Sequence, residues 1–332
     1  MKKIVFIFII FISQYSQAQD VIFSQGFLVP ETLNSSFTGA LKSTKTGALY
    51  KSQWKNSALK INSNYAFLDT WFETYKSGVG ISILNQTEEG SSYTFNQVNL
   101  NYATAFQLND SWYFRPSVSI GFGMKSFGFG NLLLEDQINI NTNSINRSSI
   151  DPIILGSKRN FFDFSSSLLL NNENSWIGLS MRHLNKPNIS LTENENDPLD
   201  IFWSVHAKYY LPILENFGQR ITVKNKIYFL LNYMQQGGFN RLDVGGQYVF
   251  DDLLSLGITA ATVPTKNDPN NPLLVSVNTF LGLRWEGFRF GYSYDLNTTK
   301  FINTGGTHEF SISYDFEINI RKLNRLKCVS YF

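Results

Sequence analysis

Residues 112–122 read W-Y-F-R-P-S-V-S-I-G-F. Every second side chain from Trp112 to Phe122 is apolar, whereas those between them include Arg115, Ser117 and Ser119. Because successive side chains of a β-strand point to opposite faces, this pattern predicts a strand with one apolar and one polar face. The same two-residue period recurs in segments 98–102, 288–295 and 309–316.

Segments of about ten residues with such alternation, separated by turn residues, are typical of transmembrane β-barrels. The chain is therefore predicted to be all-β and to form a transmembrane antiparallel β-barrel of about 14 strands. The strands are centred on residues 45–54, 57–67, 77–85, 94–107, 111–124, 161–170, 175–184, 201–212, 220–232, 240–250, 253–263, 273–285, 287–296 and 306–316.

The connections between these strands give a second test. In a barrel with an even number of strands both ends of the wall are periplasmic, so even-numbered connections are short and odd-numbered, extracellular ones are often long. The fourth, sixth, tenth and twelfth connections are short, whereas the fifth (125–160), seventh (185–200), eleventh and thirteenth are long and polar. The second, eighth and ninth connections fit this rule less well. A soluble β-sandwich gives no reason for the alternation.

Composition agrees with a barrel in a membrane. Aromatic residues make up 15% of the chain and charged residues only 16%, against about a quarter in soluble domains. The mature region contains no run of 18 apolar residues, which excludes a helical membrane protein. The formal charge of +2 comes with scattered basic residues, so no nucleic-acid partner is expected. Cys328 is the single cysteine, so an intrachain disulfide framework is excluded.

The N-terminus indicates export. Lys2 and Lys3 precede the apolar residues 4–12, and Ser16-Gln17-Ala18 offers the small residues that signal peptidase reads. We expect a signal peptide at 1–18, a periplasmic or lumenal segment at 19–44, the barrel at 45–316 and a basic tail at 317–332. The location expected is the outer membrane of a Gram-negative cell, with lipid around the wall. The tail is either solvated or a contact surface for an acidic partner.

A barrel of this size has a lumen too wide for strand side chains alone to fill. It therefore holds water or a plug, and residues 125–160 are the candidate plug because they contain the apolar run Leu132, Leu133 and Leu134. The polar phase of the strands should line this lumen. It comprises Asn99, Asn101, Arg115, Ser117, Ser119, His206, Lys208, Lys224, Lys226, Asp243, Gln247, Arg284, Arg289 and Asp295. Aromatic residues near the predicted strand ends, such as Trp71, Trp112 and Trp285, are expected to form the two interfacial girdles.

The sequence contains no arrangement typical of catalysis. We place His183 and His308 near the extracellular rim on the lipid side, and His206 in the lumen. None of them has another His or a Cys at metal-ligand spacing, and His308 has no neighbouring Ser and Asp that would complete a nucleophilic set. We therefore predict no enzyme, no cofactor and no metal.

Both ends of the mature chain resemble one family, the PorP/SprF proteins of the type IX secretion and gliding apparatus of Bacteroidetes. Near the N-terminus the matching elements are Phe23-Ser24-Gln25, Pro30, Leu33-Asn34, Phe37-Thr38-Gly39 and Gln53-Trp54. Near the C-terminus they are Tyr294-Asp295, Gly306-Thr307-His308-Glu309-Phe310, and Cys328 with the final Phe332. The departures are Val29 before Pro30, Ser35-Ser36 after Asn34, and Val329 after Cys328. They favour a paralogue dedicated to one cargo over a core component.

The resemblance implies an outer-membrane barrel that works with type IX secretion components. Such a barrel assists secretion, or surface attachment, of a large exported, adhesin-like protein. The alternative from the sequence is an outer-membrane diffusion pore, which predicts an unplugged lumen. The candidate residues for partner contact are Phe23, Ser24, Gln25, Pro30, Asn34 and Phe37, unless their segment only seals the lumen.

Overall fold

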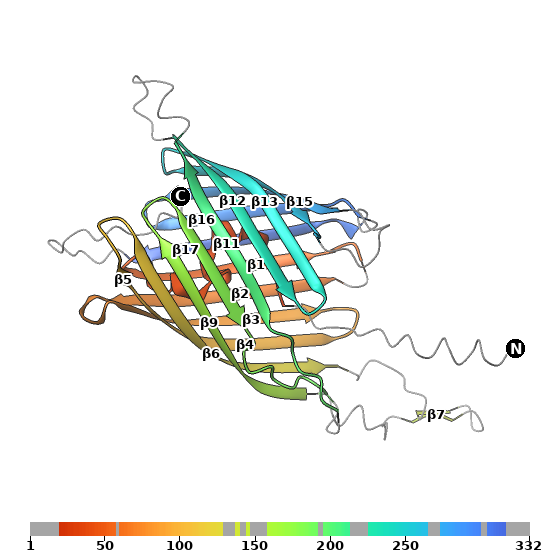
Figure 1. Ribbon diagram of the computed structural model, residues 1–332. Coiled ribbons are helices and arrows are strands. Elements are labelled where there is room, and N and C mark those ends of the chain that lie inside the picture. The colour runs from red at the N-terminus through yellow and green to blue at the C-terminus, as the bar shows by residue number, and fades with distance from the viewer. Residues whose placement is uncertain are drawn as a thin grey trace, which may run out of the picture.

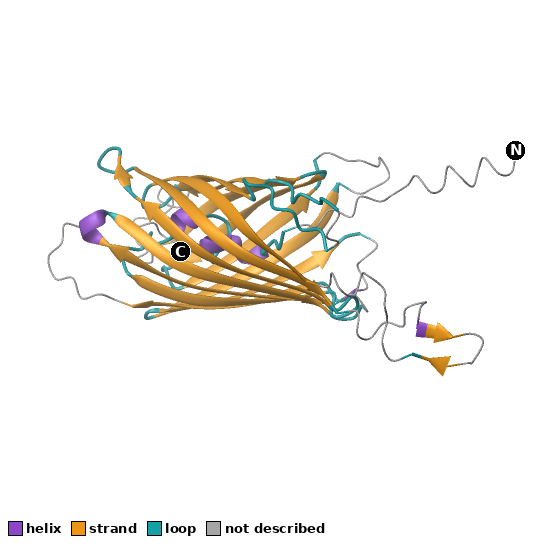
Figure 2. Ribbon diagram, turned by 90° about the horizontal axis from the view of Figure 1, so that it is seen from below, coloured by secondary structure: helices purple, strands orange, loops and turns teal. Residues whose placement is uncertain are grey.

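The computed structural model describes residues 20–57, 60–128, 137–139, 144–146, 158–191, 195–212, 225–264, 273–299 and 304–316. These residues are mostly β-strands arranged as a closed barrel (Figures 1 and 2). The expected signal peptide, the basic tail with Cys328 and Phe332, and the run Leu132, Leu133 and Leu134 lie outside the described residues. None of the described helices is long and apolar enough to cross a membrane.

Fourteen long antiparallel strands form the wall. They are β1 (Thr44–Gln53), β2 (Ile61–Phe72), β3 (Ser77–Glu88), β4 (Tyr93–Thr104), β6 (Tyr113–Phe127), β9 (Lys158–Asn171), β10 (Trp176–Arg182), β11 (Phe202–Leu211), β12 (Asn225–Gln236), β13 (Phe239–Phe250), β14 (Leu254–Thr262), β15 (Leu274–Trp285), β16 (Phe288–Asn297) and β17 (Thr307–Phe316). Each pairs with the next along the chain, and β17 pairs with β1 to close the wall. The two-residue β5 (Phe106–Gln107) prolongs the pairing with β6.

Each predicted strand is found, and the barrel is confirmed. The largest differences are in β2 and β12, which end at Phe72 and Gln236 where the sequence predicted residues 67 and 232. The reason in β2 is that its inward residues Phe67 and Trp71 are apolar. The contrast between polar and apolar faces on which the prediction rested is therefore lost there.

Inward and outward residues separate by polarity in most of the wall. In β6, Val118, Ile120 and Phe122 are about half exposed on the outer face, whereas Arg115 and Ser117 are buried in the lumen. On the outside, apolar side chains can face lipid, while a basic residue at the bilayer midplane costs about 2–4 kcal/mol. The deciding pattern of residues 112–122 is thus that of a lipid-facing strand.

The two ends of the barrel differ. At the turn end, β2–β3, β9–β10, β13–β14 and β15–β16 are joined by two to four residues. β1 begins and β17 finishes at this same end. At the loop end, longer connections join β1–β2, β6–β9, β10–β11, β14–β15 and β16–β17. Four connections are exceptions. At the loop end, β12–β13 is a two-residue turn and β3–β4 has only four residues; at the turn end, β4–β6 has eight residues and β11–β12 is long.

The lumen is occupied by residues 20–42, which we call the lumenal segment. It forms three short 3-10 helices, η1 (Ser24–Phe27), η2 (Pro30–Thr32) and η3 (Ser35–Phe37), seen inside the barrel in Figure 2. Residues 125–160 were predicted to plug the lumen, but the described part of this connection does not lie there. Its hairpin of β7 (Ile138–Asn139) and β8 (Ser144–Ile145) lies apart from the barrel (Figure 1), and Ile138 and Ile145 are exposed.

Candidate functional site

The lumenal segment crosses the barrel from one end to the other. Asp20 lies beside Arg182 and His183, where β10 finishes at the loop end. Thr44 begins β1 at the turn end. The path between them is lined by side chains of strands far away in sequence, so long-range contacts hold the segment in the lumen.

The Phe23-Ser24-Gln25 element binds the last two strands. The backbone N–H groups of Ser24 and Gln25 donate to the two carboxylate oxygens of Glu309, at 2.9 and 3.0 Å. The Gln25 side chain donates to the Glu309 carbonyl at 2.8 Å and accepts from the Ser311 hydroxyl at 2.5 Å. Glu309 is fully buried, and Lys51 Nζ lies 3.5 Å from its carboxylate. Hydrogen bonds to a buried charge are the stronger kind.

Asp295 completes this contact. The Ser24 hydroxyl donates to the Asp295 carboxylate at 2.5 Å. Thus the N-terminal motif (Ser24, Gln25) and two residues of the C-terminal motif (Asp295, Glu309) form one buried hydrogen-bonded unit. Their proximity gives a physical reason for the two distant sequence elements to occur together.

Aromatic packing holds the middle of the segment. The rings of Phe27 and Phe37 lie 5.9 and 5.1 Å from Trp176 on β10, stacked and edge-on respectively. Phe23 lies 5.9 Å from Tyr65 on β2. Phe37 has no exposed surface and Trp176 only 2%. Ring pairs at such separations stabilise beyond the burial of their area.

Asn34 is bound by strands β9 and β11. Its side-chain amide donates to the Leu168 carbonyl at 3.1 Å and lies 3.1 Å from His206 Nε2, while its oxygen accepts from Ser36 N–H and caps η3. Pro30 begins η2, where its fixed φ suits a helical first residue and no backbone N–H is needed. A Cβ at Gly178 would lie 2.3 Å from His206 and 2.8 Å from Asn34, so this approach requires glycine.

Charged and polar groups fix the segment near the turn end. Arg115 donates to the carbonyls of Ser36 and Thr38 at 3.1 and 3.0 Å. Gly39 N–H donates to Asp69 at 2.8 Å. Gly39 has φ +66, and a Cβ there would lie 2.7 Å from the Gly78 Cα, so only glycine fits.

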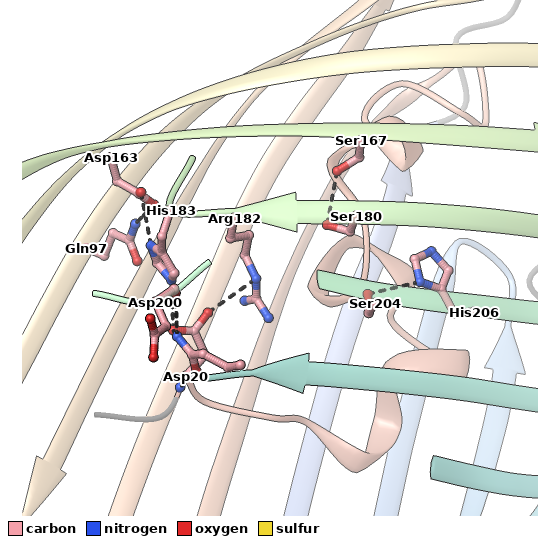
Figure 3. A network of polar contacts seen from close by, with 11 residues as sticks. Asp20, Gln97, Asp163, Ser167, Ser180, Arg182, His183, Asp200, Ser204 and His206 are labelled. Atoms are coloured by element: carbon pink, nitrogen blue, oxygen red, sulfur yellow. Dashed lines mark hydrogen bonds and ion pairs between the residues drawn. The ribbon is translucent and has the colours of Figure 1, made fainter. Parts of the chain in front are cut away.

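A charge cluster anchors the segment at the loop end (Figure 3). His183 Nε2 lies 2.8 Å from Asp20, and Nδ1 lies 3.0 Å from Asp163. Arg182 Nε lies 3.3 Å from the second Asp20 oxygen, and Gln97 donates to Asp163 at 3.0 Å. Gln236 also donates to Asp20. A doubly protonated imidazole donates to both carboxylates in this arrangement.

The charge states follow from these contacts. Burial by itself lowers the pKa of His183, but the Asp20 charge and the hydrogen bonds with Asp163 and Asp20 outweigh it and raise the pKa to about 9. Burial by itself raises the pKa of Asp20, but His183 and Arg182 hold it well below its usual value. Asp20 and His183 therefore form an ion pair at neutral pH, and we call this contact the Asp20 latch.

The position of His183 corrects one prediction. It is 2% exposed and faces the lumen, not the lipid side. The reason is that β10 ends at Arg182 and His183 has φ +61, so the strand alternation stops and both side chains turn inward. The prediction that His206 faces the lumen is confirmed, since it is fully buried there. Asp20 and Asp163 were not proposed as site residues, although Asp163 lies in the polar phase of a predicted strand.

Three further motif residues, His308, Tyr294 and Trp54, face outward or lie at the rim. His308 is on the outer wall, where Tyr292 and Tyr294 adjoin it: the Tyr292 hydroxyl is 3.0 Å from its Nδ1, and the Tyr294 ring is 4.9 Å from its ring. Trp54, with φ +57, follows the last residue of β1 at the loop end, where its backbone N–H donates to the Gly306 carbonyl at 3.0 Å.

Little empty space is left between the lumenal segment and the wall around it. A cavity of about 90 Å³ remains between the segment and the wall near Glu31, Asp69 and Ser119, enough for a few water molecules. Among the described residues, no three His, Cys, Asp or Glu side chains are placed to hold a metal ion.

Comparison with known proteins identifies the family of this chain. Residues 15–314 match the family described as the type IX secretion system membrane protein PorP/SprF. The chain belongs to this family. As a PorP/SprF protein with this barrel, it is an outer-membrane protein associated with type IX secretion. No curated protein matches the chain.

Solved structures resemble this PorP/SprF protein in shape only. The Acinetobacter baumannii outer membrane protein Omp33 has a TM-score of 0.45 and 9% identity, over 84% of this chain and 100% of that one. A deltaS2 mutant of the TodX monoaromatic hydrocarbon channel has a TM-score of 0.43 and 10% identity, over 86% and 93%. The KdgM porin has 0.38 and 8%, over 82% and 99%.

Proposed function

We propose that this protein is an accessory barrel of type IX secretion that assists the export or surface attachment of a large, adhesin-like cargo protein. The observation that carries the proposal is the lumenal segment, bound along its length by Glu309, Asp295, Trp176 and Arg115. A wall that binds a polypeptide in this way serves protein recognition better than solute diffusion.

The alternative of a diffusion pore is disfavoured by the same observation. A pore needs a continuous aqueous path, whereas the described lumen contains three helical turns packed against aromatic and charged side chains. The proposed barrel therefore conducts few ions while the segment is in place.

The six candidate contact residues, Phe23, Ser24, Gln25, Pro30, Asn34 and Phe37, are placed against the barrel wall, and all but Ser24 are buried. We propose that they meet a partner only after the lumenal segment has left the lumen. While the segment occupies the lumen, these residues seal the barrel. Sealing and partner contact are therefore successive roles of the same segment.

The test is affinity purification from detergent-solubilised outer membrane, followed by mass spectrometry and planar-bilayer recordings. The expected result is recovery of type IX components or one very large exported protein, with little conductance. Steady large conductance and no protein partner would instead identify a pore.

For the contact residues, Phe23→Ala with Phe37→Ala should reduce partner recovery and surface display of cargo, and unchanged values would contradict their assignment.

A further inference from the structure

The lumenal segment takes a lysine of the barrel wall as its own ion-pair partner. Glu31 in η2 lies 2.7 Å from Lys45 Nζ on β1, and their side chains are only 6% and 2% exposed. The Lys45 ammonium also lies 5.2 Å from the centre of the Phe67 ring. This lysine is thus held inside the lumen, between the wall and the seated segment.

The wall provides Lys45 with a second carboxylate, that of Asp69 on β2. The two residues are directly opposite in the antiparallel pairing of β1 and β2, and both side chains are buried on the lumenal face. The Cβ atoms of such residues are about 4.5–5.5 Å apart, and opposite charges at these positions stabilise a sheet. A lysine side chain spans this distance, so Asp69 is within reach of Lys45 whether or not the segment is present.

With the segment seated, this pair within the wall is not made. Asp69 Oδ1 accepts the Gly39 N–H at 2.8 Å, whereas Oδ2 is buried and has no hydrogen-bond partner. No basic side chain in the described ranges forms an ion pair with Asp69. Glu31 Oε2 is likewise buried without a hydrogen-bond partner, and both residues line the same cavity of about 90 Å³. Two buried carboxylates therefore compete for one lysine.

This competition makes the seated state less favourable than its contacts alone suggest. A buried charge without full compensation costs free energy, and a second charge of the same sign nearby adds to the cost. Asp315, the other carboxylate that acts on Asp69, is paired with Arg289 at 2.6 Å and does not offset this charge. When the segment leaves, Glu31 leaves with it. Lys45 can then pair with Asp69, and the lumen admits water to both.

We propose that Asp69 is a release residue, which competes with Glu31 for Lys45 and so keeps the seated lumenal segment exchangeable. The inference rests on the proposed departure of the segment from the lumen, and it names the wall carboxylate that sets how readily this departure occurs. Asp69 also has a holding role through Gly39, but that role needs only a neutral oxygen acceptor.

The experiment measures amide hydrogen exchange in residues 20–42 of the detergent-solubilised full-length protein. Asp69→Asn keeps an oxygen that accepts the Gly39 N–H and removes the charge. Exchange should therefore become slower by about tenfold, the effect of relieving one uncompensated buried group. The matched control is Asp252→Asn, which removes a carboxylate whose ion pair is with Lys226 on β12, at 2.9 Å. The control should leave exchange in the segment unchanged.

A second background separates competition from a merely structural role. In Glu31→Gln the segment no longer claims Lys45, so the buried lysine depends on Asp69. Adding Asp69→Asn to this variant should accelerate exchange in residues 20–42 relative to Glu31→Gln alone, the reverse of its effect in the wild type. A structural role of Asp69 predicts acceleration in both backgrounds.

Unchanged or faster exchange in Asp69→Asn alone would overturn the proposal, and so would slower exchange when Asp69→Asn is added to Glu31→Gln. Strand peptides in the same samples report whether each variant is folded. The measurement needs no partner protein, so its outcome is independent of the partner recovery that tests the proposed function.

Discussion

Replacing Glu309 by Gln tests whether the lumenal segment is held by the contact between the two motifs. The wild-type carboxylate accepts the N–H groups of Ser24 and Gln25 and faces Lys51. A Gln of the same shape can accept only one of these N–H groups, leaves the other facing an NH₂ donor, and removes the charge opposite Lys51. A hydrogen bond to a charged group contributes about 1.5–3 kcal/mol, so the lost contacts should destabilise the seated segment by about 2–4 kcal/mol.

The loss should be visible as local opening. Since about 1.4 kcal/mol changes an equilibrium tenfold, amide hydrogen exchange in residues 20–42 should accelerate by roughly 30- to 700-fold in detergent-solubilised Glu309→Gln. The measurement is exchange followed by mass spectrometry of peptides from this segment, with strand peptides as the internal reference.

Asp315→Asn is the matched control. Asp315 is an inward carboxylate on the same strand, and its ion pair is with Arg289 on β16, at 2.6 Å, and not with the lumenal segment. Unchanged exchange in residues 20–42 of Glu309→Gln would refute the reasoning. Equal acceleration in Asp315→Asn would refute it too, because the effect would then be a general loss of strand stability.

The Asp20 latch predicts a pH dependence. A histidine with its pKa raised from 6.5 to about 9 contributes about 3 kcal/mol that is fully present below pH 6.5 and is lost as pH rises through 9, whereas the lowered pKa of Asp20 keeps its contribution intact down to about pH 4. Exchange at the N-terminal end of the segment should therefore increase from pH 6.5 to 9 after correction for the intrinsic rate, and His183→Gln should abolish this dependence. Trp176→Ala should cost about 3–5 kcal/mol by loss of a buried aromatic side chain, measured by denaturant unfolding, whereas Trp285→Ala, 60% exposed on the outer wall, should cost far less. Gly178→Ala should push His206 and Asn34 apart and raise exchange around Asn34, whereas Gly246→Ala, where the nearest atom to a Cβ is 3.5 Å away, should not. Intact-mass measurement of the exported protein should show Gln19 as the first residue, and a start elsewhere would contradict cleavage after Ala18.

The strands of the barrel wall could be predicted from the sequence because the direction of each side chain is decided within its own strand. Whether Val118 faces lipid and Ser117 faces the lumen is decided by a period of two along one strand, and lipid favours apolar groups at outward positions. The same reasoning was less accurate in β2, where the inward residues Phe67 and Trp71 contact the lumenal segment and not water.

The candidate site was predicted only in part. The residues of the N-terminal segment were singled out through the family resemblance, but their partners were not, because Gln25 and Glu309 are 284 positions apart. His183 was assigned to the wrong face because one left-handed residue at a strand end reverses the direction of its side chain. Asp20 has no signal in the sequence, since its partner His183 is 163 positions away.

The sequence by itself determined a membrane barrel of about 14 strands, its polar interior and its family. Only the tertiary structure decided what fills the lumen, which residues hold it, and which face His183 takes. The physical reason is that strand polarity is imposed residue by residue by lipid and water, whereas the occupant of a closed lumen is selected by contacts among side chains from many strands, which exist only once the barrel has closed.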